Sequence, residues 1–295
     1  MRLLSDFDGV WTDPWREARE QGRVVDETLL GWAAEDGVSG VGEWLAAARA
    51  RLAAAPREHG WESDGRISAY ADEDPFVMHA ALLRLAHARA AADPLAGWLG
   101  DAVTRRGHDG LAGFGAFAHA EGVHRVEAQR GPAILADAAA AGRRLLAAGG
   151  ELVVVSNSPE DKLERWFASA ALPYTRHPAR AAHALRLRGG ARKFALGGEA
   201  PPLVLGDVGF EIARPDYRAI LDEERPRAVV GDVFSLDLAL PLALRRQVRG
   251  WEGLRLFWLR RAYTPGWLVS RIARHAPEVE VLDGGLAEAV TRLIG

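Results

Sequence analysis

The stretch "ELVVVSNSP", residues 151–159, decides the predicted fold of this chain of 295 residues. Its continuous apolar run ends in small polar residues, which is typical of a strand buried on both faces of a parallel sheet. From here to the C-terminus, strand-like and helical segments alternate. We predict strands within residues 183–197, 202–212, 227–233, 254–261 and 279–283, and helices over 160–170, 215–224 and 286–295. This alternation predicts an α/β fold with a Rossmann-like, doubly wound parallel sheet.

A short strand is predicted at residues 2–5, and the chain from about residue 24 to 147 is predicted to be almost wholly helical. Apolar residues recur at spacings of three and four within residues 29–55, 75–92, 94–103 and 132–150. We expect the first strand to join the same sheet as the later ones. The predicted domains are therefore an α/β core of residues 1–14 and 141–295 and a helical insertion of residues 15–140.

Polar residues follow three of the predicted strands directly. They are Asp6 and Asp8, then Ser156 and Asn157, and finally Asp232 with Asp237 five residues further on. In open α/β sheets, ligands bind outside the carboxyl ends of the strands, so neighbouring strands would bring these side chains into one crevice. Each aspartate alone could be an ordinary turn or helix cap, but an oxygen-rich group of this kind suits a hard cation such as Mg²⁺.

The three segments resemble motifs of the haloacid-dehalogenase-like (HAD) superfamily. "DFDGVWTD" (6–13) is similar to the first motif, DxDGxx[TV], "VVVSNS" (153–158) to the second, and "VVGDVFSLDLALP" (229–241) to the fourth, GDxxxxD. Their order also agrees, and the resemblance covers residues 1–14 and about 145–240. It implies that the helical insertion is a C1-type cap, a lid that excludes water and selects a small phosphorylated substrate.

The resemblance also implies a role for each of these residues. Asp6 would be the nucleophile that forms an aspartyl-phosphate, and Asp8 would move protons as general acid and base. Asp6 and Asp232, with the backbone carbonyl of Asp8, would ligate Mg²⁺, and Asp237 would support the metal site. The loop of Ser156 and Asn157 would bind the substrate phosphate.

Two residues compete for the cation of the third motif. Lys193 is one of only two lysines among 37 lysines and arginines, and a lysine kept in so arginine-rich a chain indicates a task specific to lysine. Arg214 lies closer to Asp232 in sequence, and its Arg-Pro opens a predicted helix, as Lys-Pro does in many relatives. Arginine could also bind phosphate oxygens, with a different geometry. Lys193 is slightly preferred, and both remain candidates.

Asp8 distinguishes between the reactions of the superfamily, because its dehalogenases lack a second aspartate at this place. We therefore predict an enzyme, a Mg²⁺-dependent phosphatase that hydrolyses phosphate monoesters of small metabolites. The alternatives are a phosphomutase on the same scaffold and a non-catalytic HAD-like binding protein.

Composition limits the partners and the location. The net charge is −3 and no basic face is evident, so we predict no nucleic-acid partner. No stretch approaches the roughly 20 apolar residues of a membrane span, and the N-terminus does not resemble a signal peptide. We therefore expect no membrane partner and a cytoplasmic location. The absence of cysteine excludes thiolate catalysis.

Overall fold

The computed structural model describes residues 1–295, which form two compact units. The α/β unit contains Met1–Asp13, Ser63–Ser68 and Pro132–Gly295, and the helical unit contains Pro14–Glu62 and Ala69–Gly131. The chain therefore begins in the α/β unit, leaves it for the helical unit, returns briefly at Ser63–Ser68 and returns finally after residue 131.

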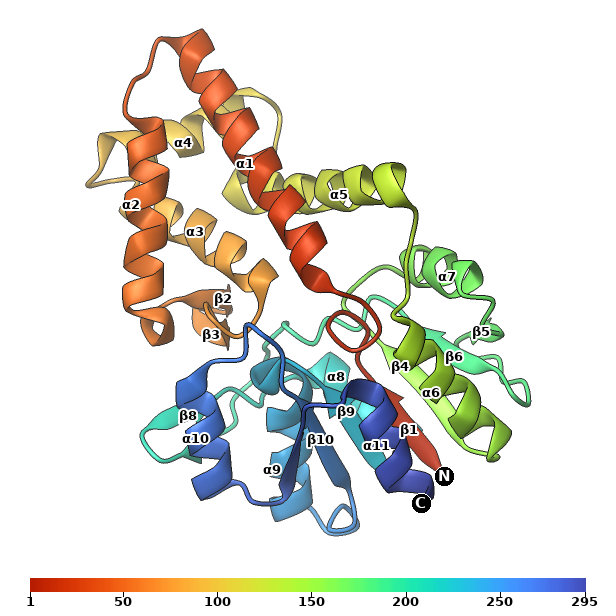
Figure 1. The fold of residues 1–295 in the computed structure, drawn as a ribbon. Helices are drawn as coiled ribbons and strands as arrows, with labels where there is room; N and C mark the ends of the chain where they lie inside the picture. Colours follow the sequence, from red (N-terminus) through yellow and green to blue (C-terminus); the bar gives the residue numbers. More distant parts are fainter. The chain divides into compact units, whose positions relative to one another are not determined.

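The α/β unit is built on a seven-stranded sheet with the strand order β11-β10-β9-β1-β4-β6-β5 (Figure 1). The strands are β1 (Arg2–Ser5), β4 (Glu151–Val155), β5 (Tyr174–Arg176), β6 (Leu185–Arg188), β9 (Ala228–Gly231), β10 (Arg255–Leu259) and β11 (Val279–Leu282). All neighbouring strands pair in parallel. The predicted fold class, a doubly wound parallel α/β sheet, is confirmed.

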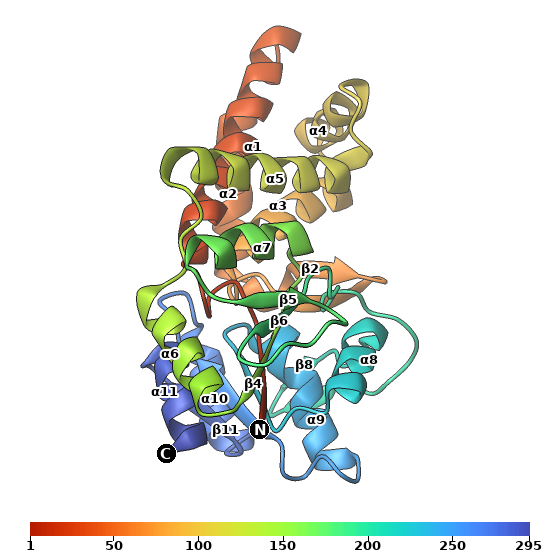
Figure 2. The ribbon, with the colours of Figure 1, turned by 90° about the vertical axis from the view of Figure 1, so that its right-hand side faces the viewer.

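Helices cover both faces of this sheet. They are α6 (Ala136–Ala147), α7 (Glu160–Ser169), α8 (Pro215–Glu224), α9 (Ala239–Gln247), α10 (Gly266–His275) and α11 (Gly285–Ile294). In both Figure 1 and Figure 2, α6 and α11 lie on one face and α8 and α9 on the other. Because both faces are covered, strands such as β4 are apolar along nearly their whole length, with Leu152 to Val155 at most 1% exposed.

The helical unit has its own apolar core and five α-helices. They are α1 (Pro14–Asp36), α2 (Val41–Ala54), α3 (Pro75–Arg89), α4 (Pro94–Arg105) and α5 (Gly110–Arg130), with a short 3₁₀ turn, η1 (Pro56–Glu58). Asp74 caps α3 by accepting a hydrogen bond from the backbone N–H of Phe76, and Asp93 caps α4 in the same way. None of the chain's helices is both long and apolar enough to cross a membrane.

The predicted helical run is interrupted where the chain forms a two-stranded hairpin, β2 (Gly60–Ser63) and β3 (Arg66–Tyr70). Asp64 and Gly65 at its tip both have positive φ angles, the conformation of a two-residue hairpin turn. The Asp-Gly pair was a usable sequence signal for this turn. The predicted helix over residues 29–55 is likewise divided, because the chain turns at residues 37–40 between α1 and α2.

Two further predictions in the second half differ from the structure. Residues 192–197, predicted as a strand, lie in irregular structure. The single strand predicted over 202–212 is a second hairpin, β7 (Leu203–Leu205) and β8 (Val208–Phe210).

The predicted domain limit at residue 140 falls inside α6, whereas the limit between the two compact units is at residue 131, before that helix begins.

Candidate active site

The three strands that carry the candidate motifs are neighbours at the centre of the sheet. β1 pairs with β4 on one side and with β9 on the other, and Ser5 is in register with both Val154 and Val230. The backbone N–H of Asp6 continues this register with a hydrogen bond of 2.9 Å to the carbonyl of Val230. The polar residues that follow the three strands therefore lie at one edge of the sheet, where the strand order changes direction.

Three buried carboxylates meet at this edge. Oxygen atoms of Asp6, Asp232 and Asp237 all lie within 4.8 Å of one another, and each of these residues is at most 9% exposed. Lys193 lies among them, with its ammonium group hydrogen-bonded to Oδ1 of Asp6 and, at 2.6 Å, to Oδ1 of Asp237. Asp237 belongs to a single π-helical turn, η2 (Phe234–Leu238), a distortion that is frequent at functional sites.

Burial and charge oppose each other in this group. Burial raises the pKa of Asp6 well above its usual value, Asp237 and Asp232 add to the increase, and Lys193 offsets part of it. Burial alone would lower the pKa of Lys193, but the carboxylates of Asp237 and Asp6 raise it above its usual value. The lysine is thus held in its charged form.

The donor set of the site fits a divalent metal ion. Three carboxylates face one ammonium group, which leaves two negative charges in a buried place. All the available ligand atoms are oxygens, which is the preference of Mg²⁺. A divalent cation would therefore balance both the charge and the ligand chemistry of Asp6, Asp232 and Asp237.

Two glycines allow the carboxylates to approach this closely. Gly9 has a φ angle of +78°, and a Cβ atom there would collide with the carboxylate of Asp232. A Cβ atom on Gly231 would similarly collide with the side chain of Asp237. The close packing of the carboxylates therefore explains why glycine occupies these two positions of "DFDG" and "VVGD".

The two candidates for the cationic residue of the third motif, Lys193 and Arg214, occupy different places. Lys193 contacts Asp6 directly, whereas the buried guanidinium of Arg214 donates to three backbone carbonyls. These carbonyls belong to Lys193, Ser68 and Glu211, the last two at 2.5 Å and 3.1 Å. The structure thus brings Lys193 to the carboxylates, and Arg214 fixes the backbone that carries it.

The loop after β4 also supports Lys193. Oδ1 of Asn157 accepts a hydrogen bond of 2.7 Å from the backbone N–H of Lys193. The backbone carbonyl of Ser156 accepts one of 2.8 Å from Ala191, and its Oγ accepts one of 3.0 Å from the N–H of Ser158. Asn157, which was predicted to bind substrate phosphate, therefore anchors the segment of Lys193 through its side chain.

Asp8 is held away from the carboxylate group. Its Oδ2 accepts a hydrogen bond of 3.0 Å from Oγ of Ser158, and its Oδ1 lies 3.4 Å from Nζ of Lys162. Of the four predicted aspartates, Asp8 is the one that the group of close carboxylates does not include. This separation suits a residue that exchanges protons instead of binding a cation through its side chain.

Several residues of the site were not identified from the sequence. Tyr263 donates a hydrogen bond of 2.5 Å to Oδ2 of Asp232, and Tyr217 donates one of 2.9 Å to the backbone carbonyl of Asp237. Lys162 and Ser158 contact Asp8. The scarcity of lysine was a usable signal for Lys162, whereas nothing local distinguishes the two tyrosines.

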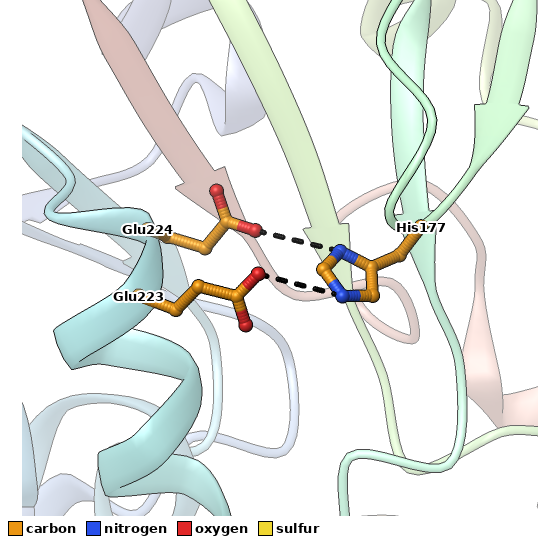
Figure 3. A group of neighbouring side chains, drawn as sticks. All are labelled: His177, Glu223 and Glu224. Atoms are coloured by element: carbon orange, nitrogen blue, oxygen red, sulfur yellow. Dashed lines mark ion pairs between the residues drawn. The ribbon is translucent and has the colours of Figure 1, made fainter.

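A second group of possible metal ligands lies elsewhere in the α/β unit. Figure 3 shows His177 facing Glu223 and Glu224, with nitrogen–oxygen distances of 3.4 Å and 3.9 Å. Arg186 and Arg188 also pair with the fully buried Glu224, and Arg188 pairs with Glu223. Because guanidinium groups already neutralise these carboxylates, the group is better explained as an ion-pair network than as a cation site.

Comparisons with known proteins give the following matches. Neither a family model nor a curated protein matches this chain. Among solved structures, the chain is similar to a putative beta-phosphoglucomutase from Thermotoga maritima, with 12% identity, a TM-score of 0.44 and coverage of 99% of both chains. It is also similar to a 2-haloacid dehalogenase from Pseudomonas syringae pv. Tomato DC3000, with 16% identity, a TM-score of 0.42 and coverage of 100% and 99%.

A third similar structure is CbbY from Rhodobacter sphaeroides in complex with xylulose-(1,5)bisphosphate. Its identity is 17%, its TM-score is 0.40, and the match covers 97% of this chain and 95% of that one. Similarity at this level assigns no function to the chain.

Proposed function

We propose that this chain is a HAD-like phosphatase that depends on Mg²⁺ and hydrolyses phosphate monoesters through an aspartyl-phosphate on Asp6. One observation carries the proposal. Asp6 and Asp8 follow the central strand β1, Asp6 is buried against Lys193, Asp232 and Asp237, and Asp8 is held separately beside Ser158. Two carboxylates with such different surroundings suit two different tasks, one nucleophilic and one in proton transfer.

In the first step, a carboxylate oxygen of Asp6 attacks the phosphorus atom and the bond to the leaving oxygen breaks. Asp8 donates a proton to that oxygen, so the leaving group departs as an alcohol. In the second step, Asp8 accepts a proton from a water molecule, which attacks the phosphorus of the aspartyl-phosphate. The bond to Asp6 breaks, and inorganic phosphate and both carboxyl groups are recovered.

The other residues position these groups and stabilise charge. Lys193 pairs with Asp6 and Asp237 and keeps a positive charge beside the nucleophile. The hydroxyl of Ser156 lies at the same edge of the sheet and would hydrogen-bond a phosphoryl oxygen, whereas the Ser156 N–H already donates to the carbonyl of Arg188. Asp6, Asp232 and Asp237, with the backbone carbonyl of Asp8, would hold Mg²⁺, which when bound supplies positive charge for the transferring phosphoryl group.

We further propose that the helical unit is the cap of this enzyme and that the substrate is a small phosphorylated metabolite. The two segments of this unit, Pro14–Glu62 and Ala69–Gly131, lie in the sequence between β1 and α6. The unit is therefore inserted between the first and second motifs. A lid at this place in the chain would exclude water during the first step and limit the size of the substrate.

The proposal is tested with purified protein, Mg²⁺ and an aryl phosphate. We expect release of inorganic phosphate that stops when EDTA removes the metal, and that the variant Asp6→Asn abolishes. The matched control is Asp13→Asn, which changes an exposed aspartate of the same segment and should keep full activity.

Two outcomes would contradict the proposal. If Asp6→Asn retained the activity of the natural protein, the nucleophile would be wrong. If the natural protein released no phosphate from any of a panel of phosphorylated metabolites, the hydrolase function would be wrong. A sugar phosphate converted to an isomer without phosphate release would instead indicate a phosphomutase.

A further inference from the structure

Lys162 is a buried lysine beside the candidate proton-transfer residue. Its side chain is 3% exposed, and Nζ lies 3.4 Å from Oδ1 of Asp8. The ammonium group also lies 5.7 Å from the ring centre of Phe7 and 5.5 Å from that of Trp166. The two aromatic rings are themselves in an edge-on contact, so Phe7 and Trp166 form a rigid wall beside the cation.

This position is unfavourable for a lysine on local grounds. Lys162 is in the first turn of α7, where the helix dipole disfavours positive charge. Burial of an ammonium group also costs free energy unless an opposite charge compensates for it. Neither local helix formation nor the apolar packing of α7 therefore explains a lysine here, whereas its contact with Asp8 does.

The contacts hold both oxygens of the Asp8 carboxyl group. Ser158 donates to Oδ2 at 3.0 Å and Lys162 lies on the side of Oδ1. Both partners belong to the segment that follows β4, the same segment that carries Ser156. The orientation of Asp8 is thereby tied to the loop that would bind the substrate phosphate.

The chain's two lysines divide between the two candidate catalytic aspartates. Lys193 contacts Asp6 and Lys162 contacts Asp8, although the chain carries 37 lysines and arginines in total. The ammonium group of lysine is a compact point charge on a flexible stem, whereas arginine carries a planar fork, so the two side chains are not interchangeable at this place.

We propose that Lys162 is a positioning residue that, with Ser158, orients the Asp8 carboxyl group for proton transfer to the leaving oxygen. This inference rests on the proposed function. Lys162 does not contact the phosphoryl group in this role. It acts through Asp8, so its loss should matter most when the leaving oxygen needs a proton as its bond to phosphorus breaks.

The test compares two substrates that differ in this need. The leaving oxygen of phenyl phosphate is strongly basic and requires a proton, whereas dinitrophenyl phosphate releases a phenolate that is stable without one. The quantity to compare is kcat/KM, because it reports the step that releases the leaving group and excludes the later hydrolysis of the aspartyl-phosphate.

We expect Lys162→Met to lower kcat/KM for phenyl phosphate by about tenfold or more, part of the roughly 10²–10⁴-fold that a positioned acid contributes. The value for dinitrophenyl phosphate should change by less than about threefold, because that reaction does not use the acid. Ser158→Ala is a smaller change that should shift the ratio in the same direction, and it serves if Lys162→Met folds poorly. The control is Arg165→Met, on the same helix and 47% exposed, which should leave the ratio unchanged.

The outcomes separate this inference from the proposed function. If the natural protein hydrolyses both substrates and each variant lowers both values equally, or lowers neither, the positioning role is refuted while the phosphatase remains. If the natural protein hydrolyses neither substrate and no other phosphate monoester, the function and the positioning role are both refuted.

Discussion

Replacement of Lys193 by methionine should affect the protein differently from replacement of Arg214 by methionine. Methionine keeps much of the length of either side chain and removes the charge. Lys193→Met takes the ammonium group away from Asp6 and Asp237, whereas Arg214→Met leaves that ammonium group in place. The first variant should therefore lose turnover, and the second should chiefly lose stability.

The magnitudes follow from the contacts. Removal of one preorganised group that stabilises transition-state charge costs about 10²–10³-fold in kcat, and we expect at least this loss for Lys193→Met. Arg214→Met deprives three buried backbone carbonyls of their donor, those of Lys193, Ser68 and Glu211. Each costs about 1–3 kcal/mol of the free energy of unfolding when it is left without a partner.

The assay measures both quantities on each variant. Urea denaturation gives the free energy of unfolding, and initial rates with saturating aryl phosphate and Mg²⁺ give kcat per folded molecule. We expect Arg214→Met to unfold at clearly lower urea concentration and to lose less kcat than Lys193→Met. If folded Arg214→Met loses as much kcat as Lys193→Met, then Arg214 is as necessary for turnover as Lys193, and the division into a catalytic lysine and a structural arginine is refuted.

Two further predictions concern Tyr263 and His79. Tyr263→Phe removes the hydroxyl that donates to Asp232 at 2.5 Å, and we expect the Mg²⁺ concentration for half-maximal activity to rise about 10–100-fold; an unchanged Mg²⁺ titration would contradict this. Burial lowers the pKa of His79 below its usual 6.5, so the unfolded chain binds the proton more readily than the folded protein. The contribution of His79 to stability is therefore complete above about pH 6.5 and is lost as the pH falls below it. The decrease in thermal stability between about pH 7 and pH 5 should be similar in the natural protein and in the control His87→Gln, and smaller in His79→Gln. An equal decrease in all three proteins would refute this prediction.

Local chemistry was sufficient to predict much of the α/β unit. The run from Leu152 to Val155 is apolar because both faces of its strand are covered, and such a run is visible without knowledge of its partners. Since parallel strands end at the same edge, the residues after β1, β4 and β9 had to lie together once these strands were neighbours. The placement of Asp6 beside Asp232 therefore followed from the sequence and one assumption about strand order.

Local sequence patterns thus predicted most strands of the sheet, though not β5, and the aspartates at its edge. Which basic residue meets which aspartate depends on packing between segments that are distant in sequence. Lys193 lies in irregular structure, where no periodicity predicts the direction of a side chain. Its position depends on Asn157 and Arg214, which are distant in sequence and bind its backbone. Lys162 is similar, because its contact with Asp8 joins residues 154 positions apart. Such contacts depend on the packing of several segments at once, which a local pattern does not record.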